Sequence, residues 1–544
     1  MTKNIQQFTQ QMTEHVKVAV NSGNLRVGIQ MLEMALKQFE LMGKAAVAPM
    51  RQTLAVLAML QRNLCEMEAS AESLDRARSL AENKAQADAL RLRQIFLLPP
   101  MMRSQKAIEE TRTHFVRELE SLDVDTVIIT DPLLDVPMLH FFLVYHGLDD
   151  RPIMELQGRV LRSICPSLRL TAPALKNVRI GNRQERLRIG FLSTHFKDHT
   201  IGKLNAGLIN ALPKEVFVKT VFLVEGQADA FSEQMAQTVE HCVRIRNNLE
   251  AARIAIVQQQ LDILYFPDIG MDPLTYFLAF YRMAPLQVST WGHPVTSGLS
   301  TIDGFIISRD MESEDGDAHF SERLIRLQHP NFAYQRPLLP ESPPDRSFFG
   351  LPEDSHIYLC PQAVFKLHPD FDPVLIDILR RDPQGRLVFI RSKYPAWDEI
   401  VMSRLTALFE DAPQRVDWLP PMPRDHFFSL LALGDIMLDP FPFCGGNTTL
   451  EALSFGTPVV TLPTRHIRGR LTYTFYRTIG IMDCVAENTN EYVHTAVHLG
   501  TNPHTREKIR EKILARCGKL YDNVTFIDEL SEALSKMLLS TSQT

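Results

Sequence analysis

Two hydrophobic patterns divide the chain. Up to about residue 120, apolar residues recur three or four positions apart, as in VGIQMLEMALKQFELM (27–42), and this spacing places them on one face of a helix. From residue 187 onwards, short apolar runs of strand length alternate with helical patterns. The two patterns predict an all-helical N-terminal region followed by α/β domains.

The helical region over residues 1–120 contains a weak internal repeat. Gly23 precedes Ala35 by twelve positions, and Cys65 precedes Ala77 by the same twelve. Small residues at such positions let paired helices approach closely, which is typical of tetratricopeptide (TPR) hairpins. The two units lie 42 residues apart, longer than a strict TPR repeat. We therefore predict a TPR-like region, with a plain helical bundle as the alternative.

The strand-like runs form two series, separated by the proline-rich segment 337–347. Each series predicts a doubly wound parallel sheet with helices on both faces. We expect a mixed helical connector over 121–184, a first Rossmann-like domain over 185–340, and a second over 350–544 that includes C-terminal helices. The expected strands are 187–193, 218–224, 261–267, 286–291 and 303–308, then 356–362, 386–392, 435–440 and 457–463.

Composition and charge narrow the function classes. With 45% hydrophobic and 22% charged residues and a net charge of −6, the chain lacks the basic surface that non-specific nucleic-acid binding needs, although small nucleotides remain possible partners. The seven cysteines are scattered singly, which is typical of reduced cytosolic thiols. The polar N-terminus resembles no signal peptide, and the most apolar window, 139–148, is too short to span a membrane. We expect a cytoplasmic protein.

The segment 435–463, DIMLDPFPFCGGNTTLEALSFGTPVVTLP, carries the strongest local signal. A predicted buried strand leads into a loop in which Gly445 and Gly446 let a ligand approach the backbone. A helix follows, and its free N–H groups and positive dipole end would bind a phosphate or diphosphate. Glu451 lies in its first turn, where it could accept hydrogen bonds from ribose hydroxyls or simply complement the helix dipole.

The residues just before that helix are polar. We expect Asn447, Thr448 or Thr449 to cap its N-terminus through a side-chain oxygen.

Four stretches in this order resemble the O-GlcNAc transferase family, including its bacterial SPINDLY-like members. They are 187–204, 284–310 with 321–327 behind it, 359–369 and 435–463, and the similarity covers about residues 185–540. The resemblance implies a GT-B fold, in which two Rossmann-like domains follow a helical TPR region. It also implies a UDP-sugar as donor, either UDP-GlcNAc or a related UDP-hexose.

Two catalytic residues are implied by the resemblance. Lys366, just after a predicted strand, would neutralise the β-phosphate as the glycosidic bond breaks. His199 matches the family's active-site histidine and would either accept a proton from the acceptor or orient the sugar. His195 is a departure, because the family usually has aspartate there.

The remaining matches lie around the expected donor. The block with Trp291 and Gly292 would line the sugar, Gln362 would contact the sugar or the diphosphate, and His426 with Arg424 would meet the base, although the spacing there is one residue shorter. The full set of donor-binding residues implied is Trp291, Gly292, Gln362, Arg424, His426, Asn447, Thr448, Thr449 and Glu451.

Asp315 and Asp317 form a D-x-D triplet, by which another class of glycosyltransferases holds a divalent metal. Charged loops often produce this triplet, and here it follows a strand of the first domain. The resembled family uses lysine and a helix dipole instead of a metal. We therefore expect neither a metal nor a cofactor.

Together these features predict an inverting, metal-independent glycosyltransferase that moves GlcNAc from a UDP-sugar to Ser or Thr of a protein. The stacked N-terminal helices would present the acceptor polypeptide. Three alternatives within enzymes are a protein N-glucosyltransferase, a GDP-fucose-using transferase and a nucleotide-sugar epimerase of the same fold. A catalytically degenerate helical scaffold is the non-enzymatic alternative.

Overall fold

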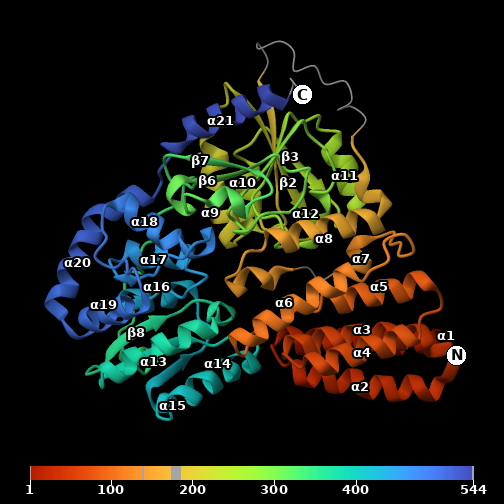
Figure 1. Ribbon diagram of the computed structural model, residues 1–544, viewed down its shortest axis with the longest axis horizontal. Helices are drawn as coiled ribbons and strands as arrows, with labels where there is room; N and C mark the ends of the chain where they lie inside the picture. The colour runs from red at the N-terminus through yellow and green to blue at the C-terminus, as the bar shows by residue number, and fades with distance from the viewer. Residues whose placement is uncertain (1, 138–139, 173–185, 542–544) are drawn as a thin grey trace.

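The computed structural model describes residues 2–137, 140–172 and 186–541. It consists of a helical N-terminal region and two domains, each built on a parallel sheet (Figure 1). The predicted architecture is confirmed. Residues 138–139 and 173–184 of the predicted connector lie outside the described residues.

The N-terminal region stacks antiparallel helices against the second sheet domain (Figure 1). Trp397 of that domain donates its indole N–H to the carbonyl oxygen of Asn63 at 2.6 Å, and Arg404 donates to the carbonyl oxygen of Met102 at 2.6 Å. The helices are α1 (Thr2–Asn21), α2 (Leu25–Met42), α3 (Val47–Asn63), α4 (Met67–Ser79), α5 (Lys84–Ile95) and α6 (Gln105–Glu120).

The weak internal repeat has a different physical basis from the one expected. Gly23 and Cys65 do not lie between paired helices but in the turns that join α1 to α2 and α3 to α4, with φ values of +79° and +61°. Ala35 and Ala77 are buried in the second helix of each pair. The repeat therefore preserves a left-handed turn position and a small buried residue, as in a helical hairpin.

The first sheet has the strand order β3-β2-β1-β4-β5-β6-β7, all parallel. The chain order reverses between β1 and β4, which makes the carboxyl ends of these two strands the switch point where such sheets bind ligands. The strands are β1 (Leu187–Leu192), β2 (Phe217–Val224), β3 (His241–Ile245), β4 (Ile263–Phe266), β5 (Leu286–Thr290), β6 (Gly304–Ser308) and β7 (Arg323–Leu327). The helices are α7 (Pro132–Asp135), α8 (Arg151–Ile164), α9 (Thr200–Ala211), α10 (Ala230–Ala236), α11 (Leu249–Val257) and α12 (Pro273–Leu278).

The second sheet has the order β10-β9-β8-β11-β12, with its switch point between β8 and β11. Its strands are β8 (His356–Cys360), β9 (Gly385–Ile390), β10 (Val416–Leu419), β11 (Ile436–Leu438) and β12 (Val459–Val460). Its helices are α13 (Asp372–Arg381), α14 (Pro395–Leu408), α15 (Ala412–Arg415), α16 (Arg424–Leu433), α17 (Asn447–Ser454), α18 (Leu471–Ile479), α19 (Thr489–Thr501) and α20 (Pro503–Arg516).

All nine expected strands are present, although β12 keeps only two of the seven residues expected over 457–463. Three strands were not expected, and all three lie at a sheet edge. In β3 only Ile245 is buried, in β7 only Leu324 and Leu327 are buried, and β10 is a half-buried strand of four residues. Edge strands lack the continuous apolar run by which the central strands are recognised.

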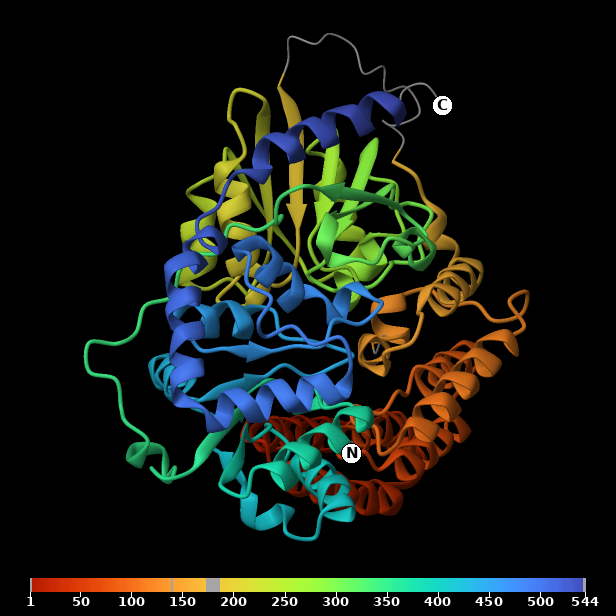
Figure 2. The same ribbon diagram turned by 60° about the vertical axis from the view of Figure 1, so that its left-hand side comes forward.

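The chain crosses between the two sheet domains twice. The proline-rich segment 337–347 forms an exposed loop on the outside of the molecule (Figure 2). After α20 the chain returns, and α21 (Phe526–Thr541) packs against the core of the first sheet. The two crossings touch, because Tyr334 and Tyr521 form a parallel bridge and the backbone N–H of Asp522 donates to the carbonyl oxygen of Tyr334 at 2.9 Å.

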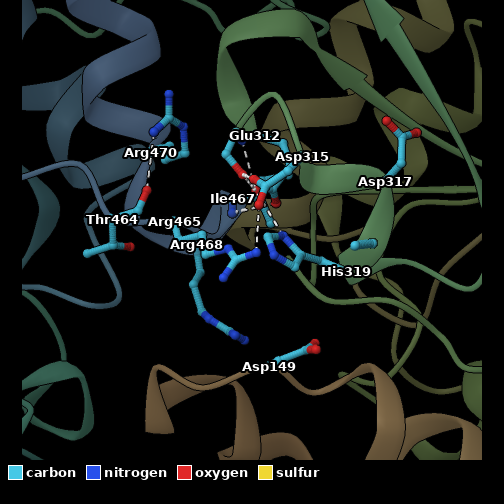
Figure 3. Close-up of polar contacts among 12 residues, drawn as sticks. Asp149, Glu312, Asp315, Asp317, His319, Thr464, Arg465, Ile467, Arg468 and Arg470 are labelled. Carbon is cyan, nitrogen blue, oxygen red and sulfur yellow. Dashed lines mark hydrogen bonds and ion pairs between the residues drawn. The ribbon is translucent and has the colours of Figure 1, made fainter.

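Polar contacts hold the two domains together on another side (Figure 3). Glu312, after β6, accepts a hydrogen bond from the backbone N–H of Ile467 at 2.8 Å and lies 3.3 Å from Nδ1 of His319. Arg468, beside Ile467, pairs with the buried carboxylate of Asp150, which precedes α8. These contacts tie the second domain both to the first sheet and to the connector.

Candidate active site

The glycine loop that follows β11 is held in one conformation by a buried carboxylate. Asp439 accepts hydrogen bonds from the backbone N–H of Gly445 at 2.6 Å and from the Thr461 hydroxyl at 2.7 Å. Burial raises the pKa of Asp439 to about 6. A Cβ at Gly445 would lie 2.4 Å from Oγ1 of Thr449, so the loop admits only glycine there.

Helix α17 begins at Asn447 with Gly446 at its N-cap position, and no side chain of the described residues caps it. The expectation that Asn447, Thr448 or Thr449 caps the helix is therefore wrong. All three lie inside the first turn, because the glycine conformation already turns the chain. The uncapped N–H groups at this end keep their capacity to bind an anion.

The three polar residues of this first turn have different surroundings. Thr449 is fully buried, and its hydroxyl lies 3.0 Å from the hydroxyl of Thr472. Thr448 is partly exposed. The side-chain oxygen of Asn447 is buried and has no hydrogen-bond partner among the described residues. Asn447 thus carries an unused acceptor at the helix end.

Lys366 reaches this loop from the neighbouring strand. It ends a short helical turn, Val364–Lys366, after β8, and its Nζ donates to the carbonyl oxygen of Cys444 at 3.1 Å. The ammonium group also lies 4.6 Å from the centre of the Phe443 ring. Burial lowers the pKa of Lys366, against the opposing effects of Cys444 and Asp439. The structure therefore brings the predicted phosphate lysine to the predicted phosphate loop.

Gln362 lies at the same switch point. It is buried, and its amide nitrogen lies 3.4 Å from the carbonyl oxygen of Leu438, the last residue of β11. The side chain thereby links the segment after β8 to the segment after β11.

Glu451 lies where the domains meet. Tyr334, from the first crossing, donates its hydroxyl to Oε1 of Glu451 at 3.1 Å. Burial raises the pKa of Glu451, while Tyr334 and the charges of Arg424 and Lys203 act in the opposite direction. Lys203 belongs to α9 of the first domain, so the carboxylate is influenced from both sides of the interface.

A cavity of about 720 Å³ opens beside Tyr334. It lies between α9 and α10 of the first domain, the first crossing and the start of α16. Its polar and aromatic lining includes Lys203, Asn210, Phe231, Tyr334, Arg336 and Arg424. Neither Lys366 nor His199 lines it, so this cavity could hold only the end of a ligand that is remote from Lys366.

The two base-contacting residues implied by the resemblance lie at the start of α16. The His426 ring meets the ring of the exposed residue Phe348, just after the proline-rich segment, edge to face at 4.8 Å. The Arg424 guanidinium lies 4.9 Å from the centre of the Phe428 ring. Of these two, Arg424 lines the cavity and His426 does not.

Trp291 and Gly292 follow β5 in the first domain. Trp291 is buried, donates its indole N–H to Asn331 at 2.9 Å, and therefore supports the loop from within. Gly292 donates its backbone N–H to the carbonyl oxygen of Pro267 at 3.0 Å, and a Cβ there would lie 2.3 Å from that oxygen. Only glycine, which has no Cβ, allows the two backbone segments to approach this closely.

His199 caps α9 at the carboxyl end of β1. Its Nδ1 accepts the backbone N–H of Ile201 at 3.2 Å. Burial, aided by His195 and Lys197, lowers the pKa of His199 to about 4. The imidazole is therefore neutral at pH 7.

Sequence reasoning missed four residues that shape this site. They are Asp268, whose Oδ2 lies 3.0 Å from Nδ1 of His195, and Tyr334, Asp439 and Lys203. Asp439 stands inside the quoted motif, and a buried-strand pattern followed by an acidic residue could have identified both Asp439 and Asp268. Tyr334 and Lys203 carry no local signal, because their importance arises only from contacts or charges across the domain interface.

Comparisons with known proteins find similarity to protein glycosyltransferases. Residues 343–530 match the model of Glycosyl transferase family 41. The probable UDP-N-acetylglucosamine–peptide N-acetylglucosaminyltransferase SEC of Arabidopsis thaliana is 27% identical over 383 residues, which are 68% of this chain and 38% of the relative. The chain thus spans well under half of that relative.

Two further proteins extend the comparison. A UDP-glucose:protein N-β-glucosyltransferase of Actinobacillus pleuropneumoniae serotype 7 is 26% identical over 284 residues, which are 50% of this chain and 44% of that protein. The solved structure of a Thermobaculum terrenum O-GlcNAc transferase variant superimposes with a TM-score of 0.73 at 22% identity, covering 100% of this chain and 99% of that one. At that identity the match shows a shared fold.

Proposed function

The chain is similar in sequence to the O-GlcNAc transferase and SPINDLY glycosyltransferases and has the fold of a bacterial O-GlcNAc transferase, and from this premise we propose that it transfers a sugar from a UDP donor to a protein. The proposed sugar is GlcNAc, and the proposed acceptor is a Ser or Thr hydroxyl. Transfer proceeds by one in-line displacement with inversion, without a metal or a further cofactor.

The contact of Lys366 with the Cys444 carbonyl carries this proposal. Cys444 lies three residues before the start of α17, so this contact brings a single ammonium group close to the uncapped N-terminus of that helix. A diphosphate in that position meets a full positive charge and a set of free N–H groups together. Both of these interactions become more favourable as the sugar–phosphate bond breaks, because negative charge then grows on the leaving oxygen. They therefore lower the reaction barrier more than they strengthen donor binding.

The nucleoside end of the donor fits one turn further along α17, at Glu451. Glu451, oriented by Tyr334, accepts hydrogen bonds from the ribose hydroxyls, and the base enters the neighbouring cavity beside Arg424. The His426 ring would reach the base by rotating away from the Phe348 ring that it contacts in this structure.

The D-x-D triplet supports the metal-independent form of the proposal. Asp315 pairs with Arg465 at 2.6 Å, and Asp317 pairs with Arg326 at 2.8 Å (Figure 3 labels three of these residues). Each carboxylate is therefore already paired with an arginine side chain. Their loop belongs to the interdomain contacts around Glu312 and not to the switch point of either sheet.

We propose that the N-terminal helices receive the acceptor polypeptide. Stacked helical hairpins form extended surfaces, and several large apolar side chains on this region are exposed, among them Val18, Met34 and Leu41. No helix of the described residues is long and apolar enough to cross a membrane.

A protein N-glucosyltransferase is the second candidate, because the Actinobacillus relative bears that name. It differs from the first only in the sugar and in the acceptor atom, an amide nitrogen in place of a hydroxyl oxygen.

Donor and acceptor can be identified together. The protein is incubated with isotopically labelled UDP-GlcNAc, UDP-glucose or GDP-fucose and a lysate of its host, and labelled peptides are sequenced by mass spectrometry. Label from UDP-GlcNAc on Ser or Thr supports the proposal, and label from UDP-glucose on Asn supports the second candidate. No label from any donor, together with no rise in melting temperature with UDP, would indicate a non-catalytic scaffold.

A further inference from the structure

A histidine and a buried carboxylate face each other at the switch point of the first sheet. Nδ1 of His195, which follows β1, lies 3.0 Å from Oδ2 of Asp268, which follows the neighbouring strand β4. The same oxygen accepts the Ser193 hydroxyl at 2.8 Å, and the Ser193 oxygen accepts the backbone N–H of His195 at 2.9 Å. Asp268 has no exposed surface. The carboxylate therefore fixes both the ring and the loop that carries it.

This contact determines which nitrogen of His195 bears the proton. A carboxylate oxygen and an unprotonated ring nitrogen 3.0 Å apart would oppose lone pair to lone pair, so Nδ1 carries hydrogen and donates to Asp268. Nε2 is then an unprotonated acceptor. The His195 side chain is 19% exposed, so an incoming hydroxyl can reach the ring.

The neighbouring histidine has the opposite tautomer. His199 accepts the Ile201 N–H at Nδ1, so its proton lies on Nε2, and its pKa of about 4 keeps it neutral. The two rings lie with their centres 4.6 Å apart. One imidazole thus offers a hydrogen-bond donor and the other an acceptor, side by side.

The position of the pair relative to the donor site follows from the fold. His195 and Asp268 lie at the carboxyl ends of β1 and β4, as Lys366 and the glycine loop lie at the carboxyl ends of β8 and β11. In each sheet these are the two strands between which ligands bind. Lys203, on α9 one turn beyond His199, lines the same cavity as Arg424 at the start of α16, so this end of the first sheet faces the second domain.

We propose that His195, held by Asp268, is the general base that activates the acceptor, and that His199 is a hydrogen-bond donor that positions the reacting group. This inference rests on the proposed glycosyl transfer. His195 would be a catalytic residue and Asp268 a positioning residue, since the carboxylate acts only through the ring.

The proton and the electron pairs balance in one displacement. As the acceptor oxygen forms its bond to the anomeric carbon, its hydrogen moves to Nε2 of His195. The bond from that carbon to the β-phosphate oxygen breaks, and its electron pair leaves with UDP. His195 becomes an imidazolium whose Nδ1–H still faces the carboxylate of Asp268, and it loses the extra proton to solvent afterwards. Other charged groups around the pair are Lys197 on the same loop, Lys203 on α9 and Asp272 beyond β4.

The tautomer can be measured without substrate. In protein labelled with ¹⁵N-histidine, long-range proton–nitrogen correlations distinguish a protonated Nδ1 from a protonated Nε2, and the His195 signal is identified by its loss in His195→Gln. We expect Nδ1–H at pH 7.5 in the wild type and Nε2–H in Asp268→Asn, whose amide can donate to Nδ1. An Nε2–H tautomer of His195 in the wild type would overturn the inference whatever the activity.

Kinetics test the role itself. Release of UDP from UDP-GlcNAc, with water or a lysate protein as acceptor, is followed in His195→Gln, in Asp268→Asn and in the exposed control His241→Gln. We expect kcat to fall about 10²-fold or more in the first two, as for the loss of a general base, while the affinity for UDP stays unchanged. The acid limb of the pH profile of kcat should disappear in His195→Gln. The control should match the wild type.

The two proposals fail in different ways. Full turnover in His195→Gln would overturn the role of the base and leave the proposed function intact. An equal loss of UDP affinity and turnover would show that the pair only supports the loop, which also overturns it. A wild type that turns over none of the three donors would refute the proposed function, and the inference with it.

Discussion

The Nζ of Lys366 lies 3.1 Å from the carbonyl oxygen of Cys444, so the segments that follow β8 and β11 meet through a partly buried ammonium group. This carbonyl would be displaced, or shared, when a diphosphate enters. The contact therefore holds the lysine in place before the donor binds, and the side chain loses little freedom on binding.

Lys366→Ala should reduce turnover far more than donor affinity. An ammonium that faces the departing β-phosphate acts mainly in the transition state, and by analogy with a lost oxyanion donor we expect kcat to fall roughly 10²–10³-fold. Single-turnover rates with UDP-GlcNAc and calorimetric titration with UDP measure the two effects. The exposed Lys37→Ala on α2 is the matched control. Normal turnover in Lys366→Ala would remove the lysine from the mechanism.

Glu451→Ala should weaken UDP binding by roughly ten-fold or more, because hydrogen bonds to a charged acceptor are worth about 1.5–3 kcal/mol. In the wild type, 2′-deoxy-UDP should also bind more weakly than UDP. The two losses should not add, since they remove the same contact. Additive losses in calorimetric titrations would place the ribose elsewhere. Tyr334→Phe, which removes only the hydroxyl that orients Glu451, should have a smaller effect.

The stability of the protein should depend on pH through Asp439. Its pKa is about 6 in the folded state, above the ordinary value of 3.8, so the folded state binds more protons between these values. The free energy of unfolding should therefore fall as pH rises from about 4 to about 6, by roughly 3 kcal/mol for this group. Asp372, whose pKa burial also raises to about 6, adds to the slope.

Urea unfolding at several pH values in this range measures the effect, and Asp439→Asn should flatten the slope. The exposed Asp411→Asn should retain it. An unchanged slope in Asp439→Asn would show that the carboxyl group is not protonated in the folded protein.

Activity should survive EDTA, and the double variant Asp315→Asn, Asp317→Asn should turn over like the wild type. Both carboxylates are paired with arginines, Asp315 across the domain interface and Asp317 within the first domain, and they have no part in the proposed displacement. Strong inhibition by EDTA that Mn²⁺ reverses, combined with loss of activity in the double variant, would assign the triplet a metal.

Much of the fold could be predicted from the sequence, because the central strands are continuous apolar runs and their alternation with helices admits few topologies. The approach of Lys366 to the glycine loop follows from the same reasoning, since each residue comes after a strand at the switch point. Two features could not be predicted. The short edge strands β3, β7 and β10 have no long apolar run, and the return of α21 to the first sheet leaves no trace in local periodicity.

The side-chain chemistry was less predictable than the backbone. The pairing of His195 with Asp268 joins residues 73 positions apart, and that of Tyr334 with Glu451 joins residues 117 positions apart. Neither pair lies within one motif. The resemblance identified His199 but treated His195 only as a departure, because the role of a histidine depends on which nitrogen its neighbours leave free.

The bridge between Tyr334 and Tyr521 has a mechanical consequence. Because both passages of the chain between the domains meet there, we expect any rocking of one domain against the other to pivot near this pair, while regions far from it would move furthest. Tyr334 also donates to Glu451, and Tyr521 donates to the carbonyl oxygen of Leu450 at 2.5 Å. The ribose of a bound donor would thus lie close to the pivot and keep its contacts. The space around the sugar would meanwhile open to exchange acceptors.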